Sequence, residues 1–179
     1  PKVILNYLSL LGWNPDSDQE IFNENDLVKS FQFQQVQKKS AVFDEKKLLW
    51  ISQQHLSEMN VRDLMNEIYA LSPGWGDGLE WDYLKEVVKL IKDRCKTIKE
   101  VATMSELFFT DKIDYDPDLL SKTFNNESIA IIKDFHTALN TVENWSRVEL
   151  ENIFENIMEQ HEVVIGKVMK PIRVALSGI

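Results

Sequence analysis

Residues 81–100 read WDYLKEVVKLIKDRCKTIKE, and apolar side chains recur in this stretch every three or four positions. This spacing places them on one face of an α-helix. The apolar positions are Leu84, Val87, Val88, Ile91, Cys95 and Ile98. Thr97 and Glu100 have the spacing of a capping box, which favours the start of a new helix. The stretch therefore predicts two consecutive helices that divide near Cys95 and Lys96.

The sequence before this stretch predicts two more helices and a loop. Residues 73–78, PGWGDG, follow no strand and so lack the context of a phosphate-binding loop, which predicts an interhelix loop or hinge. Asn60 and Asp44 are good N-cap residues for helices over 60–71 and 44–57. The middle of the chain is thus expected to be continuously helical.

Helical spacing extends toward both ends of the chain. Short helices are expected over 3–11 and 26–33, and longer ones over 129–139 and 146–158, the last beginning with a Ser146–Glu149 capping box. No segment alternates apolar and polar residues as a half-buried strand does. The sequence predicts an all-α protein.

Composition excludes several classes of protein. Lys and Arg number 20 against 29 Asp and Glu, a formal charge of -9, so any binding to a polyanion must be local. A single cysteine forms no internal disulfide and predicts a reducing, cytoplasmic setting. No apolar run reaches the roughly 20 residues that cross a bilayer, so we expect no membrane partner.

The residues that usually carry catalysis are sparse. His55, His136 and His161 lie far apart without metal-ligand spacing, so we expect no metal site. Cys95 lies on the apolar face of its helix, where a lone cysteine acts as a small hydrophobe. The sequence predicts no catalytic residue in these 179 positions.

One basic feature stands out. Lys85, Lys89 and Lys92 are spaced by four and three residues, so they are expected along one side of a helix, where they can follow a row of phosphates. The alternative is an ordinary solvated face, because Glu86 and Asp93 lie nearby. Both interpretations remain open at this point.

Arg94 follows this lysine stripe. At 100° per residue it is expected near Val87 and Leu90, at the edge of the apolar face. A guanidinium buried there needs a partner, which a carboxylate or a nucleobase edge can supply.

Four segments, in order along the chain, resemble the bacterial-type glutamyl-tRNA synthetases. The first, PKVILNYLSLLGW at 1–13, is similar to the run that follows their catalytic domain. Residues 41–50, AVFDEKKLLW, are similar to a Val-Phe-Asp, Lys-Leu, Trp pattern of the family. RCKTIKE at 94–100 and GKVMKPIRVALSG at 166–178 resemble segments of its anticodon-binding region.

The resemblance implies a domain organisation. Residues 1–59 are expected to be part of a helical stem-contact region, and 60–179 a multi-helix anticodon-binding region (an α-helix cage) with subdomains over 60–106 and 107–179. The chain starts at Pro1, and the family's His-Ile-Gly-His and Lys-Met-Ser-Lys-Ser signatures are absent. We expect a C-terminal portion that lacks the catalytic domain and the final helices and that holds no cofactor, ATP and Mg²⁺ serving the parent's catalytic domain.

The resemblance also implies a function. The parent is expected to be a glutamate–tRNA ligase that uses ATP, and this portion binds tRNA without catalysing. Arg94 and Arg173 fall on family arginines that read anticodon bases, a task suited to a planar guanidinium. Lys85, Lys89 and Lys92 are expected at most to contact the RNA backbone, which orients without discriminating.

The expected partner is tRNA for glutamate, with tRNA for glutamine left open; no DNA partner is expected, and the protein is expected to be a monomer. The alternative is a helical protein-interaction module without RNA binding, supported by the acidic charge and by Trp75 and Trp81 if they are exposed.

Overall fold

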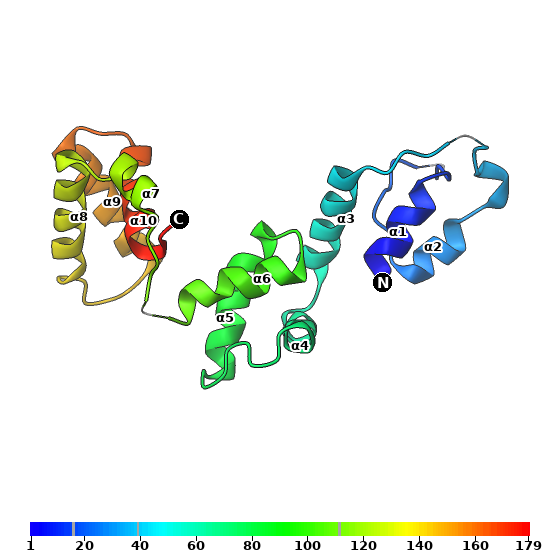
Figure 1. The fold of residues 1–179 in the computed structure, drawn as a ribbon, viewed down its shortest axis with the longest axis horizontal. Helices are drawn as coiled ribbons and strands as arrows, with labels where there is room; N and C mark the ends of the chain where they lie inside the picture. The colour runs from blue at the N-terminus through cyan, green and yellow to red at the C-terminus, as the bar shows by residue number, and fades with distance from the viewer. Residues whose placement is uncertain (16, 39, 111) are drawn as a thin grey trace. The chain divides into compact units, whose positions relative to one another are not determined.

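The computed structural model describes residues 1–15, 17–38, 40–110 and 112–179 (Figure 1). Within them every regular element is a helix, and the extended backbone forms a single isolated bridge between Trp13 and Val36. The prediction of an all-α protein is confirmed. The described helices include none with the length and apolarity to cross a membrane.

The chain forms two compact units, Pro1–Phe109 and Thr110–Ile179. The first unit contains the α-helices α1 (Lys2–Leu10), α2 (Glu24–Ser30), α3 (Glu45–Glu58), α4 (Val61–Leu71), α5 (Trp81–Ile91) and α6 (Ile98–Ser105) and the 3₁₀ turns η1 (Phe33–Gln35), η2 (Lys92–Arg94) and η3 (Glu106–Phe108). The second contains α7 (Pro117–Thr123), α8 (Asn126–Leu139), α9 (Arg147–His161) and α10 (Ile165–Ser177). The predicted division at 59/60 and 106/107 stays a prediction.

The predicted helix caps form. Side-chain oxygens of Asp44, Asn60, Thr97 and Ser146 accept hydrogen bonds from backbone N–H groups in the first turns of α3, α4, α6 and α9. The Glu100 carboxylate reaches back to the N–H of Lys96, 2.6 Å away, rather than to that of Thr97. This arrangement starts α6 where the sequence predicted a second helix.

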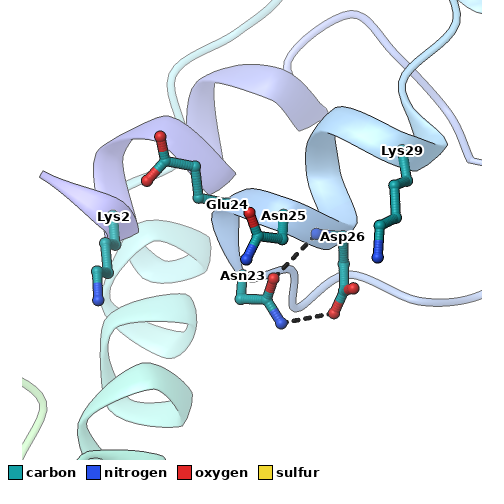
Figure 2. A pocket seen from close by; sticks show the side chains of 6 residues that line it. All are labelled: Lys2, Asn23, Glu24, Asn25, Asp26 and Lys29. Atoms are coloured by element: carbon teal, nitrogen blue, oxygen red, sulfur yellow. Dashed lines mark hydrogen bonds between the residues drawn. The ribbon is translucent and has the colours of Figure 1, made fainter.

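The helix predicted over 26–33 lies at Glu24–Ser30 instead. Asn23 is its N-cap: the side-chain oxygen accepts from the Asp26 N–H at 2.9 Å, and the side-chain amide donates to the Asp26 carboxylate (Figure 2). The cap moves the start by two residues because Asn23 satisfies a donor that the first turn leaves free.

The loop before α5 is shaped by glycine. Gly74, Gly76 and Gly78 all have positive φ, between 71° and 91°, as predicted for an interhelix loop. At Gly76 a Cβ would lie 2.6 Å from the Leu84 side chain, which packs against this loop. The loop thereby completes an apolar core formed by α4, α5 and α6, which contains Leu64, Ile68, Leu84, Val88 and Val101.

In the second unit α8, α9 and α10 pack against one another, and α7 packs against α10. Ile131, Phe135, Ile157, Val168 and Ile172 form the centre of its core. The helix α10 was not predicted from periodicity. It ends at Ser177 and is capped by Gly178, whose φ of 73° and close approach to the Asp114 carbonyl leave no room for a Cβ.

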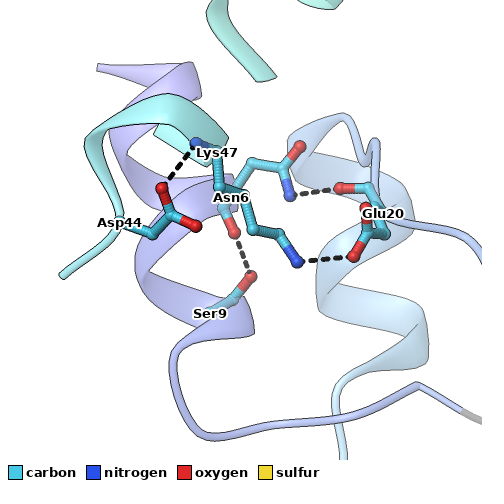
Figure 3. Close-up of polar contacts among 5 residues, drawn as sticks. All are labelled: Asn6, Ser9, Glu20, Asp44 and Lys47. Carbon is cyan, nitrogen blue, oxygen red and sulfur yellow. Dashed lines mark hydrogen bonds and ion pairs between the residues drawn. The ribbon is translucent and has the colours of Figure 1, made fainter. Parts of the chain in front are cut away.

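A buried amide joins the N-terminal elements of the first unit. The Asn6 side chain, 1% exposed, donates to the Glu20 carbonyl (2.9 Å) and accepts from the Phe22 N–H (3.0 Å). Asp44 caps α3 next to it, and the Lys47 ammonium pairs with the Glu20 carboxylate (Figure 3). The Asn6 bonds hold the irregular segment between α1 and α2 against α1, and the Lys47–Glu20 pair joins the same segment to α3.

Asn6→Ala is expected to lower the free energy of unfolding by roughly 2 kcal/mol, because it leaves a buried N–H and a partly buried carbonyl without partners. Chemical denaturation measures this change. Asn25→Ala, at an exposed position of α2, is the matched control and should change little. Equal stability of the two variants would mean that water replaces the amide.

The same amide fixes the state of His55. Its Nε2 lies 2.9 Å from the Asn6 side-chain oxygen, which can only accept, so Nε2 carries the hydrogen. Burial lowers the pKa of His55 below its ordinary value of 6.5; Glu58 opposes this shift and Lys2 adds to it.

This pKa shift predicts a pH dependence. The unfolded chain binds the His55 proton at a higher pH than the folded chain does. The contribution of neutral His55 to the free energy of unfolding is therefore complete above pH 6.5 and is lost as the pH falls through the folded pKa. The unfolding free energy of His55→Gln, which keeps a donor toward Asn6, should fall less between about pH 7 and pH 5 than that of the wild type. His136→Gln, at an exposed position, should retain the wild-type slope.

Candidate nucleic-acid interface

Arg94 lies on a short turn between two helices of the first unit. The helix α5 ends at Ile91, and Lys92–Arg94 form the 3₁₀ turn η2 before α6 begins at Ile98. Cys95, the next residue, is fully buried and anchors the turn in the core. The Arg94 side chain is exposed, and within the described residues its guanidinium has no hydrogen bond or ion pair.

This position corrects the expected environment of Arg94. The prediction placed it at the edge of the apolar face by continuing the helical wheel past Ile91. Because α5 ends there, the wheel does not reach Arg94, and the guanidinium faces solvent rather than a buried partner. It is free to meet a ligand without first breaking a bond within the described chain.

The turn is held by α3 through side chains that the sequence did not single out. The Ser52 hydroxyl donates to the Lys96 carbonyl at 2.6 Å, and the Gln53 side-chain amide donates to the Asp93 carbonyl at 3.2 Å. Both bonds join residues at least 40 positions apart. No local sequence signal reveals them, since neither spacing belongs to a helix or a turn.

Lys92 completes this connection in the opposite direction. Its ammonium donates to the carbonyls of Ser57 (2.6 Å) and Met59 (3.1 Å), at the C-terminal end of α3. These are carbonyls that a helix end leaves without an intrahelical donor. The turn and α3 are therefore fastened by hydrogen bonds in both directions, which positions the Arg94 backbone.

The three lysines of the predicted stripe lie on two different elements and have different partners in the structure. Lys85 and Lys89 lie on α5, and the Lys89 ammonium bonds the Glu86 carboxylate at 2.6 Å, a bond that lowers the pKa of Glu86. Lys92 lies in η2 with its ammonium bound to α3. The backbone role for the three lysines stays a prediction, and Lys85 is the one without a bonded partner in the described chain.

Arg173 lies in the second unit, on α10, one turn before the helix ends at Ser177. Its side chain is exposed and, among the described residues, unpaired. Its neighbours Ile172 and Val174 are buried, so the backbone beneath it is fixed by the core. Arg94 and Arg173 thus belong to different units, each presented from a fixed backbone.

Of the residues that would suggest other chemistry, Cys95 and Trp75 are packed within the protein, whereas Trp81 is exposed. Burial raises the pKa of the Cys95 thiol, whose Sγ contacts Met104 Sδ at 3.4 Å. Trp75 is buried and donates its indole N–H to Ser105, while Trp81 stacks on Tyr69. His, Cys, Asp and Glu side chains form no group suited to a metal within the described ranges. The alternative of a protein-interaction module therefore loses the support of Trp75 and keeps that of the exposed Trp81.

Lys92→Met is expected to destabilise the first unit by about 1–2 kcal/mol, because two carbonyls at the end of α3 lose their donor. Hydrogen exchange of the Cys95 amide, which donates to the Lys92 carbonyl, should accelerate as the turn loosens. Lys96→Met, on an exposed side chain next to the same turn, is the control and should leave both measurements unchanged. Unchanged exchange in Lys92→Met would refute the positioning role.

Two family models match the chain. Residues 53–179 match the model described as an anticodon binding domain. Residues 1–50 match the model of the catalytic domain of class I tRNA synthetases (E and Q). Arg94 and Arg173 both fall within the first match.

Curated relatives cover nearly the whole chain. The chain is 31% identical over 178 residues to the glutamate–tRNA ligase of Flavobacterium johnsoniae, and 32% identical over 178 residues to that of Flavobacterium psychrophilum. Each alignment covers 99% of this chain and 35% of the relative. The chain therefore spans about a third of the length of these relatives.

A solved structure has the same fold. The crystal structure of a glutamate tRNA ligase from Elizabethkingia meningosepticum, in complex with its amino acid, superposes with a TM-score of 0.79 at 23% identity. The match covers 99% of this chain and 35% of that one. It supports the helical architecture described above.

Proposed function

We propose a function from one premise: the chain belongs to the anticodon-binding domain family, whose model matches residues 53–179. We infer that it is the tRNA-binding part of a glutamate–tRNA ligase, which attaches glutamate to tRNA with ATP. The names of the aligned relatives support this inference. ATP and Mg²⁺ serve the activation step in this proposal, and neither ATP-handling signature occurs in these 179 residues.

The observation that carries the proposal is the presentation of Arg94 and Arg173. Each guanidinium is exposed on a backbone held by buried neighbours, and neither is paired within the described residues. Loop bases of an RNA can be splayed out, stacked on a guanidinium and hydrogen-bonded at their edges. We assign both arginines to anticodon bases, in a tRNA for glutamate or also for glutamine.

Lys85 and Lys89 are proposed as backbone contacts. The Lys89–Glu86 pair is exposed and therefore weak, so a phosphate can compete for the Lys89 ammonium. Lys92 has a different status, because moving its ammonium to a phosphate would leave the α3 carbonyls without their donor. We propose that Lys92 positions Arg94.

The decisive experiment uses the complete ligase that contains this chain. Arg94→Ala and Arg173→Ala should each cost about 1–3 kcal/mol in kcat/KM for glutamate tRNA and relax discrimination against tRNAs altered in the anticodon. Arg94→Lys should restore little, because an ammonium lacks the planar fork of a guanidinium.

The matched control is Arg62→Ala, which removes an exposed arginine from α4 and should change neither affinity nor discrimination. Unaltered anticodon discrimination in Arg94→Ala would refute the assignment of that residue. Glutamate and glutamine tRNAs charged side by side decide the partner. A complete protein that charges neither would favour the protein-interaction alternative.

A further inference from the structure

A basic pocket in the second unit has no role in the function proposed so far. It has a volume of about 230 Å³ and lies where the end of α7 and the start of α8 meet the first half of α10. Its lining includes Lys122 from α7 and Lys167 and Lys170 from α10. Lys122 is far from the other two in the sequence and is brought to them by the packing of α7 on α10.

The charge of the pocket contrasts with that of the whole chain. The lining contains three lysines and one acidic residue, Glu127, in a chain of net charge -9. Glu127 lies 3.6 Å from the Lys167 ammonium, and both side chains are largely exposed. Lys122 and Lys170 have no ion pair within the described residues, so the pocket keeps a local excess of positive charge.

Gly166 provides a second, independent observation. It lies in the first turn of α10 and lines the same pocket. A Cβ built on it would meet nothing within 4 Å, so the packing of this chain does not require glycine there. Glycine weakens a helix relative to alanine, and one common reason to keep it is that a ligand approaches the backbone closely.

Thr123 also lines the pocket, and its Oγ1 is buried without a hydrogen-bond partner among the described residues. The hydroxyl lies below the surface of the pocket and is not counted among the groups that a ligand would meet. A phosphate accommodated in the pocket would instead meet the three lysines and the open backbone at Gly166.

We propose that this pocket binds a phosphate of the RNA backbone and so anchors tRNA to the second unit. The inference rests on the proposed function, since the RNA is the tRNA assigned there. Lys170 and Arg173 are three residues apart on α10 and therefore share one side of the helix. Lys170 binds backbone beside the arginine that reads a base.

The test compares two variants of the 179-residue chain that lose equal charge. The pocket variant is K122Q/K167Q/K170Q, and the control is K46Q/K112Q/K133Q, which removes three exposed lysines outside the pocket. Glutamate-tRNA binding is titrated at several salt concentrations. The pocket variant should bind at least about tenfold more weakly, with the slope of log K against log salt reduced by about two, and the control far less.

A third variant separates binding from folding. Gly166→Ala should leave the thermal midpoint unchanged or higher, because alanine favours the helix, yet weaken tRNA binding by blocking close approach. Lys170→Arg keeps a phosphate ligand and should bind like the wild type. Normal binding by Gly166→Ala, or equal losses in the pocket and control variants, would overturn the proposal.

A further measurement tests the pocket proposal separately from the proposed tRNA function. Inorganic phosphate added to ¹⁵N-labelled chain should shift the amide resonances of Gly166 and Lys167 in the wild type and not in the pocket variant. If phosphate shifts these amide resonances but the chain binds no tRNA, the anion site is supported and the tRNA function is refuted. Strong tRNA binding that the pocket variant retains would support the function and refute the pocket.

Discussion

The interaction on which the first unit depends is the contact between the Lys92 ammonium and the last carbonyls of α3. A helix C-terminus carries partial negative charge and unpaired acceptors, so a cation there satisfies both needs at once. Ser52 and Gln53 return hydrogen bonds from α3 to the backbone on the other side of the turn. The turn between α5 and α6 is consequently as well determined as the helices that flank it, although it is only a few residues long.

Most of the helical architecture could be predicted because its signals are local. A cap side chain accepts a hydrogen bond from an N–H only two or three positions further along the chain. The cap residues could therefore be recognised without any knowledge of the fold; they are Asp44, Asn60, Thr97 and Ser146. The segment after Trp13 was not predictable in the same way. Its position depends on Asn6, which reaches Glu20 and Phe22 across 14 and 16 positions.

The candidate site, too, was only partly predictable from the sequence. Arg94 and Arg173 were found through resemblance to a family, and the structure adds their exposure and the fixed backbone beneath them. Periodicity misjudged the surroundings of Arg94 because it does not tell where α5 gives way to a tighter turn. It also grouped Lys92 with Lys85 and Lys89, since a helical wheel does not report which ammonium reaches another helix. The basic pocket left no signal, because Lys122 and Lys167 are brought together only by packing.

The helix α10 places Lys170, which lines the pocket, and Arg173, the proposed base reader, on one continuous element. Three residues of α-helix rise about 4.5 Å along its axis. In the proposed complex, helix geometry therefore fixes the distance between the backbone position of the phosphate-binding Lys170 and that of the base-reading Arg173. A loop in this position would let that backbone spacing vary, whereas the helix keeps it fixed.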